Sequence, residues 1–487
     1  MLKLDNNSLL RDAAFIDGAW RGARSGARFA VKNPATGEII AEVADLAEDD
    51  VREAIEAAHR AFPLWRSKTA KERAAVMRRW YELMMAAQED LAQLMTAEQG
   101  KPIAESRGEV AYGASFVEWF AEEGKRIYGD VIPTNVRGRR IVVLKEPVGV
   151  VAAVTPWNFP NAMITRKVAP ALAAGCTVVV KPAQLTPLSA LALAELAQRA
   201  GLPKGIFNVV PSSQSALVGK ELTENPLVRK FSFTGSTEVG KQLMRQCAST
   251  VKKISLELGG NAPFIVFDDA DLDAAVTGAL ASKFRNMGQT CVCANRFLVQ
   301  DGVYDAFAEK LSRAVGALKI GNGMTPGIEQ GPLINMAAVQ KVEELIGDAT
   351  KKGAKVALGG KRHALGGTFF EPTIVRDVTK DMAFAREEIF GPVVTLFRFK
   401  DDEEAIRMAN DTEYGLAAYF YARDVGRIFR VMEGLEYGIV GVNEGIISTE
   451  VAPFGGMKES GMGREGSKYG IEDFVEIKYV ALGGLGI

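Results

Sequence analysis

Two of the four cysteines stand in one short stretch, Phe284 to Arg296, which gives the chain its clearest candidate for covalent chemistry. Cys291 and Cys293 follow a turn that begins at Gly288, and they precede the apolar run Phe297-Leu-Val. That order places a thiol at the edge of a loop, where it can act as a nucleophile once it is deprotonated. The alternative interpretation is two small buried residues, because free cysteine often only fills core space.

A base for such a thiol is more readily a carboxylate than a histidine. The chain has only two histidines, His59 and His363, and both stand in charged or glycine-rich surroundings typical of a surface. Glu257, in contrast, is alone in the apolar segment Ser255 to Phe267 and is followed by a double glycine. Apolar neighbours raise the pKa of a glutamate, which suits it to exchange protons near neutral pH. A strand glutamate that faces solvent would fit the same alternation.

Length and composition bound the class of protein. The chain has 487 residues, 47% hydrophobic and 24% charged, enough for about three domain-sized units. Its 59 Lys and Arg nearly balance its 60 Asp and Glu, which indicates neither a nucleic-acid nor a membrane partner. The longest apolar run, Val168 to Val180, contains Pro170 and is too short to cross a bilayer. With no secretory pattern, disulfide framework or zinc spacing, the sequence predicts a cytoplasmic protein without a metal.

The order of the expected elements indicates an α/β fold. From about residue 146 to 256, short β-rich runs alternate with helical patterns, which is typical of a mostly parallel, doubly wound sheet. Before this region the periodicity predicts helices over roughly 46–61, 70–100 and 105–128. After it, helices are expected near 303–318 and 337–353. The segment 137–145 is expected to be a strand that pairs outside the main body.

Four polar or glycine residues fall at or just past predicted strand ends: Asn158, Lys181, Gly235 and Glu257. Because ligands bind beyond the carboxyl ends of parallel strands, together they predict one binding edge, although each alone could be an ordinary turn residue. The segment from Gly235 to Lys241 has the spacing of a phosphate-binding loop, but Gln242 replaces the residue that would bind magnesium. A pyrophosphate at a helix N-terminus therefore fits better than ATP hydrolysis.

Seven motifs, in order along nearly the whole chain, resemble those of the aldehyde dehydrogenase superfamily. They are Pro156-Trp-Asn-Phe-Pro160, Lys181-Pro-Ala183, Phe233-Thr-Gly-Ser236, Leu256-Glu-Leu-Gly-Gly260, Gly288-Gln-Thr-Cys291, Glu388-Ile-Phe-Gly-Pro392 and Pro453-Phe-Gly-Gly456. More narrowly, the segments Ile164 to Lys167, Phe284 to Asn295 and Gly463 to Asp473 resemble the succinate-semialdehyde dehydrogenases.

The resemblance implies a division of the chain and a set of site residues. It implies a Rossmann-type cofactor domain (1–130 and 148–258), an α/β catalytic domain (259–470) and a β arm (131–147 and 471–487) that forms a homodimer or homotetramer. Cys291 would be the nucleophile and Glu257 the base, and Asn158 would form the oxyanion hole with the Cys291 peptide N–H. The implied cofactor residues are Trp157, Lys181, Pro182, Ala183, Gln184, Gly235, Ser236, Leu258, Glu388 and Phe390. The implied substrate-carboxylate residues are Arg166, Arg285 and Ser448.

The implied reaction is oxidation of succinate semialdehyde to succinate with NAD(P), through a thiohemiacetal and a thioester on Cys291. Glutarate semialdehyde and a broader range of aldehydes stay open, because one methylene gives only about 1–3 kcal/mol of discrimination. A cofactor-independent thioester hydrolase or acyltransferase could use the same cysteine and glutamate.

Two finer expectations concern single residues. Gln184 stands where NAD-using relatives commonly carry a glutamate, so the absence of that negative charge beside Lys181 favours NADP, with NAD still possible. Cys293 could form a reversible disulfide with Cys291, provided that the loop rearranges, because alternate side chains of an extended segment point to opposite sides.

Overall fold

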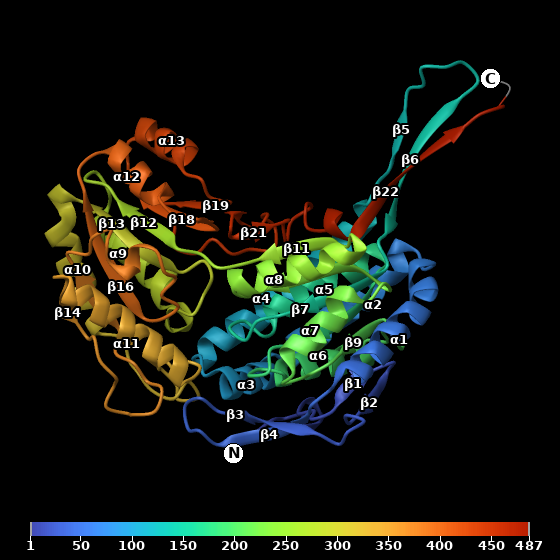
Figure 1. Cartoon of the computed structure of the whole chain (residues 1–487), viewed down its shortest axis with the longest axis horizontal. Helices are drawn as coiled ribbons and strands as arrows, with labels where there is room; N and C mark the ends of the chain where they lie inside the picture. Colours follow the sequence, from blue (N-terminus) through green and yellow to red (C-terminus); the bar gives the residue numbers. More distant parts are fainter. Residues whose placement is uncertain (1, 486–487) are drawn as a thin grey trace.

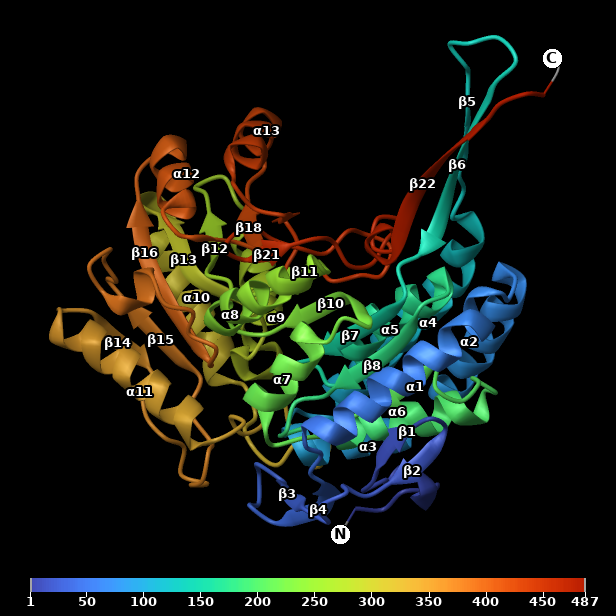
Figure 2. The same cartoon turned by 45° about the vertical axis from the view of Figure 1, so that its right-hand side comes forward.

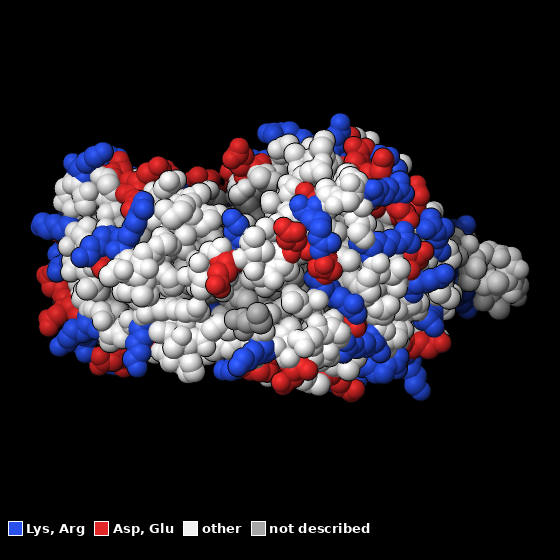
Figure 3. Space-filling view, turned by 90° about the horizontal axis from the view of Figure 1, so that it is seen from below, with Lys and Arg blue, Asp and Glu red and all other residues white. Residues whose placement is uncertain are grey.

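The computed structural model describes residues 2–485 and consists of two large sheets flanked by helices, with a slender arm that projects from one side (Figure 1). The predicted α/β class is therefore confirmed. On the face seen in Figure 3, acidic and basic residues are intermingled, as expected for a chain of net charge −1. No helix within residues 2–485 is long and apolar enough to cross a membrane.

The first sheet contains the predicted doubly wound arrangement. Its strand order is β2-β1-β9-β8-β7-β10-β11-β21, and the strands from β9 to β11 are parallel. Its strands are β1 Ala14–Ile16, β2 Ala19–Arg21, β7 Val150–Val154, β8 Thr177–Lys181, β9 Phe207–Val209, β10 Val228–Thr234, β11 Lys253–Glu257 and β21 Gly461–Met462. The crossover helices are α5 Ala162–Ala174, α6 Leu188–Arg199, α7 Ser215–Glu224 and α8 Thr237–Cys247. Strand β8 is buried over its whole length, as a parallel strand covered on both faces must be.

Four helices precede the parallel strands of this sheet: α1 Glu48–Arg66, α2 Ala70–Ala86, α3 Gln88–Gln99 and α4 Ile103–Glu123. The single helix predicted over 70–100 is wrong, because the chain breaks at Ala87 (φ −100°, ψ 16°). No glycine or proline marks this break, so periodicity alone could not reveal it. Helix α3 ends at Gly100 with φ +94°, where an added Cβ would also meet Pro34 and Pro332.

The second sheet has the order β14-β15-β16-β13-β12-β18-β19 and is parallel from β15 to β19. Its strands are β12 Ala262–Val266, β13 Ala294–Gln300, β14 Lys355–Leu358, β15 Thr373–Arg376, β16 Val393–Phe399, β18 Ala417–Tyr421 and β19 Ile439–Val442. Its helices are α9 Leu272–Phe284, α10 Tyr304–Gly316, α11 Met336–Lys351, α12 Asp402–Asn410 and α13 Val425–Gly434. Two small pairs, β3 Arg28–Lys32 with β4 Ile39–Ala44 and β17 Tyr414–Gly415 with β20 Met457–Lys458, complete the sheets.

The arm is a three-stranded antiparallel sheet of β5 Asp130–Ile132, β6 Arg140–Pro147 and β22 Val475–Leu482, well separated from the body in Figures 1 and 2. The predicted strand at 137–145 indeed pairs outside the main body. The proposed domain limits stay a prediction, and one feature departs from them: β21, inside the predicted catalytic segment 259–470, pairs with β11 of the first sheet. Residues 486–487 of the predicted arm lie outside the described residues.

Candidate active site

A short irregular loop presents Cys291. After α9 ends, the 3-10 turn Arg285–Gly288 leads through Gln289 and Thr290 to the cysteine, and β13 begins three residues later. Gly288 has φ +74°, and a Cβ there would also collide with the carbonyl group of Gly391, so only glycine fits this close approach. The loop lies just before β13, at the end of the second sheet that is directed toward the first sheet.

A cavity of about 380 Å³ lies between the two sheets and is lined by residues from both. Eight of the predicted site residues line it: Trp157, Asn158, Gly235, Ser236, Leu258, Cys291, Glu388 and Phe390. The first five follow the carboxyl ends of β7, β10 and β11, which is the edge that the strand-end argument predicts. The cavity thus brings together the candidate nucleophile, Cys291, and the candidate phosphate-binding loop at Gly235, although they are more than fifty residues apart in the sequence.

The two cysteines of the loop differ in what they face. Cys291 is partly exposed and lines the cavity, whereas Cys293 is buried and its thiol donates to the main-chain oxygen of Lys283 at 3.4 Å. Only Cys291 is therefore accessible to a substrate in the cavity, and Cys293 fills core space. A disulfide between them stays a prediction.

Burial raises the pKa of the Cys291 thiol to about 12; the nearby guanidinium of Arg166 opposes this, and the carboxyl group of Glu388 adds to it. The thiol is therefore protonated at neutral pH in the free enzyme, and it needs a base before it can attack. 

We expect the alkylation of Cys291 by iodoacetamide in the free enzyme to accelerate by about tenfold for each pH unit between 7 and 9, because only the thiolate reacts. The rate is measured by mass spectrometry of the peptide that contains the cysteine, with Cys291→Ala as the blank. A plateau below pH 8 would contradict the raised pKa.

Glu257 ends β11 and is 3% exposed, and neither of its carboxyl oxygens has a hydrogen-bond partner within residues 2–485. Burial is the main cause that raises its pKa well above the ordinary value, Glu465 adds repulsion, and Arg166 and Lys167 oppose both. The interpretation of a solvent-facing strand glutamate is thus wrong. A buried, protonated carboxyl group beside the cavity can act as a general acid and, once it has lost its proton, as a general base.

Glu465 and Lys167 are two partners of this site that the sequence did not predict. Glu465 is buried, accepts a hydrogen bond from Nε of Arg166 at 2.9 Å and forms an ion pair with Lys167. Desolvation alone would raise the pKa of Glu465, but the two cations lower it below the ordinary value. It therefore stays ionised while Glu257 holds a proton. In the sequence, Arg464 and Glu465 stand together inside a glycine-rich loop. A loop has no helix or strand periodicity from which the burial of Glu465 could be predicted.

The three predicted carboxylate-binding residues are only partly brought together. Arg285 and Ser448 line one small cavity, and Arg285 makes no ion pair with any carboxylate of the described chain. Arg166 instead has Glu465 as a buried partner, although its Nη2 makes no aligned hydrogen bond inside the described chain. The substrate role of Arg166 stays a prediction. Tyr112 on α4, which was missed, has a buried hydroxyl without a partner in the described chain.

The predicted cofactor residues fall into two groups. Glu388 accepts a hydrogen bond from the peptide N–H of Gly260 at 3.1 Å, and burial raises its pKa to about 7. The rings of Trp157 and Phe390 pack edge to face, with their centroids 5.6 Å apart. In contrast Lys181, Pro182, Ala183 and Gln184 do not line the cavity; Lys181 is buried at the end of β8, and burial lowers its pKa to about 8. Ala337, Ala338 and Lys341 of α11 form a further wall of the cavity, which no sequence pattern predicted.

Comparison with known proteins identifies this arrangement. The profile of the aldehyde dehydrogenase family matches residues 20–480, so the chain belongs to the aldehyde dehydrogenase family and is an oxidoreductase. It is 65% identical to the glutarate-semialdehyde dehydrogenase of Pseudomonas aeruginosa and 65% identical to the NADP(+) succinate-semialdehyde dehydrogenase of Escherichia coli, covering 99% of this chain and 100% of each relative. The solved structure of succinate-semialdehyde dehydrogenase from Burkholderia pseudomallei superposes with a TM-score of 0.98 at 62% identity, over 99% of this chain and 100% of that one. The resemblance read from the motifs is confirmed.

Proposed function

We propose that this protein oxidises succinate semialdehyde to succinate with NAD(P), through a covalent thioester on Cys291. The observation that carries the proposal is that Cys291 and Asn158 line the same cavity, while Glu257 is buried next to Leu258 of its wall. The relatives named for succinate and glutarate semialdehydes support the substrate class. The carboxyl edge of the first sheet carries a helix N-terminus and glycines that suit a dinucleotide. A thioester hydrolase that needs no cofactor would have no use for them.

The residues around the cavity fit a dinucleotide. Ser236 caps α8, whose N-terminus opens into the cavity, and the hydroxyl of Thr234 beside it is buried without a partner in the described part of the chain. A Cβ at Gly259 would come within 3.1 Å of the Glu388 carboxyl group, so a side chain there would crowd Glu388. Ser236 and Gly235 would hold the pyrophosphate and Glu388 the nicotinamide ribose. When bound, the nicotinamide accepts the two electrons and the hydrogen that leave the aldehyde carbon.

The side chains of this protein supply the remaining steps. Glu257, once deprotonated, takes the proton of the Cys291 thiol, and the sulfur adds to the aldehyde carbon to form a thiohemiacetal. The charge on the former carbonyl oxygen is stabilised by the Asn158 amide and the Cys291 peptide N–H, a contribution of about 2.7–4 kcal/mol for one such donor. After oxidation to the thioester, Glu257 first gives up to solvent the proton that it took from Cys291, and it then removes a proton from water. The water attacks the thioester carbon, and this proton passes to the leaving sulfur, so that the carboxylic acid and the Cys291 thiol are released.

We further propose that Arg285 and Ser448 bind the distal carboxylate of the substrate. Replacing Arg285 by Met should lower kcat/KM for succinate semialdehyde by about 10- to 100-fold, since a hydrogen bond to a charged group is worth about 1.5–3 kcal/mol. Butanal, of equal chain length but uncharged, should lose little. The panel compares both aldehydes and glutarate semialdehyde in wild type and variant. An equal loss for butanal would show that Arg285 has only a structural role.

For the cofactor, we propose a preference for NADP, with NAD also used. Gln184 is exposed just beyond the end of β8 and adds no negative charge beside Lys181. The change Gln184→Glu should lower kcat/KM for NADP by roughly tenfold, because the new carboxylate repels the 2′-phosphate. The measurement is kcat/KM for both cofactors at saturating aldehyde. A wild type that prefers NAD, or a variant with unchanged preference, would show that another residue makes the choice.

The arm supports a proposal of self-association into a homodimer or homotetramer. Its sheet exposes large apolar side chains, with Val131 76%, Ile477 70% and Tyr479 60% exposed. Apolar exposure on that scale is typical of a surface that a second protein covers. The division into cofactor domain, catalytic domain and arm belongs to the same proposal.

A further inference from the structure

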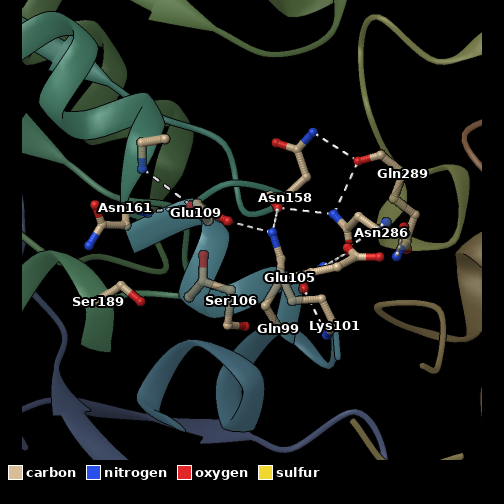
Figure 4. A network of polar contacts seen from close by, with 12 residues as sticks. Gln99, Lys101, Glu105, Ser106, Glu109, Asn158, Asn161, Ser189, Asn286 and Gln289 are labelled. Carbon is tan, nitrogen blue, oxygen red and sulfur yellow. Dashed lines mark hydrogen bonds and ion pairs between the residues drawn. The ribbon is translucent and has the colours of Figure 1, made fainter. Parts of the chain in front are cut away.

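A network of buried polar side chains lies behind the wall of the cavity that carries Asn158 (Figure 4). Lys101, between α3 and α4, is fully buried, and its ammonium donates to the main-chain oxygen of Asn158 at 2.7 Å. The same ammonium is paired with the carboxylate of Glu109 on α4. Glu109 in turn accepts hydrogen bonds from the peptide N–H groups of Asn161 at 2.9 Å and Ala162 at 3.2 Å. The ion pair therefore holds the turn at Asn158 itself and at the start of α5.

Asn286 connects this turn to the cysteine loop. Its Nδ2 donates to the main-chain oxygens of Asn158 at 3.0 Å and of Gln289 at 3.3 Å, and its Oδ1 accepts from Gln99 at 2.8 Å. The Asn158 side chain donates to the same Gln289 oxygen at 3.0 Å. Asn286 also has φ 50°, a left-handed conformation that an asparagine tolerates better than most residues. One amide thus fixes the separation between the Asn158 turn and the loop that leads to Cys291.

This separation matters because the two oxyanion donors come from different halves of the molecule. The Asn158 amide follows β7 of the first sheet, and the Cys291 peptide precedes β13 of the second. Donors must be held within a fraction of an ångström to stabilise a developing charge. Burying a lysine and a glutamate costs desolvation free energy, so such a pair adds little to the stability of the fold. Its position against the Asn158 turn therefore indicates another role.

We infer that Lys101, together with Glu109 and Asn286, positions the Asn158 amide against the Cys291 loop so that both donors address one oxygen atom. The inference rests on the proposed function, in which these donors stabilise the thiohemiacetal oxyanion. None of the three residues lines the cavity. They are therefore positioning residues, which act through Asn158 without touching the reacting atoms.

The test begins with Lys101→Met, which keeps the length of the side chain and removes its donors. We expect kcat for semialdehyde oxidation to fall by about 10- to 100-fold with KM nearly unchanged. Hydrolysis of p-nitrophenyl acetate without cofactor should fall by the same factor, because its tetrahedral intermediate needs the same donors. Alkylation of Cys291 by iodoacetamide should keep the wild-type rate, since it forms no oxyanion.

A matched control separates positioning from stability. Lys252 is also buried and donates to two main-chain oxygens, those of Asn225 at 2.6 Å and Val228 at 2.8 Å, but neither of these residues belongs to the Asn158 turn or the Cys291 loop. Lys252→Met should lower the melting temperature and leave kcat unchanged. Should Lys101→Met not fold, Asn286→Gly removes the bridging amide while permitting the positive φ, and it should show the same kcat loss.

A double-mutant cycle gives the decisive result. In the Asn158→Ala background, Lys101→Met should cost less than about twofold in ester hydrolysis, because residues that act as one unit are not additive. An equal cost in both backgrounds, an unchanged kcat in folded Lys101→Met and Asn286→Gly, or a parallel loss of alkylation would overturn the inference. If the wild type hydrolyses the ester but oxidises no semialdehyde, the proposed function fails while the ester assay still decides the positioning role.

Discussion

Replacing Cys291 by alanine is expected to lower aldehyde oxidation by roughly 10⁴-fold or more, because loss of the nucleophile removes the covalent route. Steady-state reduction of NADP at saturating succinate semialdehyde measures the effect. The cysteine lines the cavity and is the only member of its pair that a substrate can reach.

Cys293→Ala provides the matched control two residues away. Its thiol is buried against Lys283, so the change should leave most of the activity and cost some stability through the small cavity that it creates. Equal loss in the two variants, or an active Cys291→Ala enzyme, would mean that the nucleophile is misassigned.

The second large effect is expected from Glu257→Gln. An amide cannot remove a proton from water, so hydrolysis of the thioester should slow by about 10²–10⁴-fold. Glu257 also takes the proton of the Cys291 thiol, but at pH 9 solvent hydroxide can replace it in that step, so oxidation should be slowed less than release. We therefore expect a rapid burst of NADPH, equal to the enzyme concentration, followed by very slow turnover.

Stopped-flow absorbance resolves the burst from the steady phase. A control comes from Glu98→Gln, because Glu98 is also a fully buried glutamate with a raised pKa but caps α6 through Leu188 and Ser189. That variant should alter stability and retain turnover. A Glu257→Gln enzyme without a burst at pH 9 would show that the glutamate is required for oxidation more than for release of the acid.

The sequence predicted those features that short-range pattern encodes. Alternating apolar runs located the parallel sheet, and the residues that follow its strands, such as Asn158 and Gly235, indeed share one edge. The family motifs predicted that Cys291, rather than Cys293, faces the cavity, although spacing alone did not distinguish them. Glu257 could be predicted because a single carboxyl group in an apolar segment has few alternatives to burial.

What the sequence did not predict depends on contacts between distant segments. The break at Ala87 has no glycine or proline signal, because tertiary packing and not propensity ends the helix there. Glu465 and Lys101 lie near the site only because segments that are distant in the sequence pack together in the fold. A lone charged residue in a loop is ordinarily solvated, so neither residue was predicted. Arg166 was predicted as a ligand for substrate, but nothing local indicated its ion pair with Glu465.

The central claim is that a carboxylate-bearing aldehyde becomes a thioester on Cys291. It is tested most directly by acid-quenching Glu257→Gln enzyme within the burst, after mixing with succinate semialdehyde and NADP, and mapping its peptides by mass spectrometry. We expect one succinyl group on the peptide that contains Cys291 and Cys293, located on Cys291 by fragmentation and removed by hydroxylamine. A burst of NADPH without that adduct, or an adduct on Cys293, would contradict it.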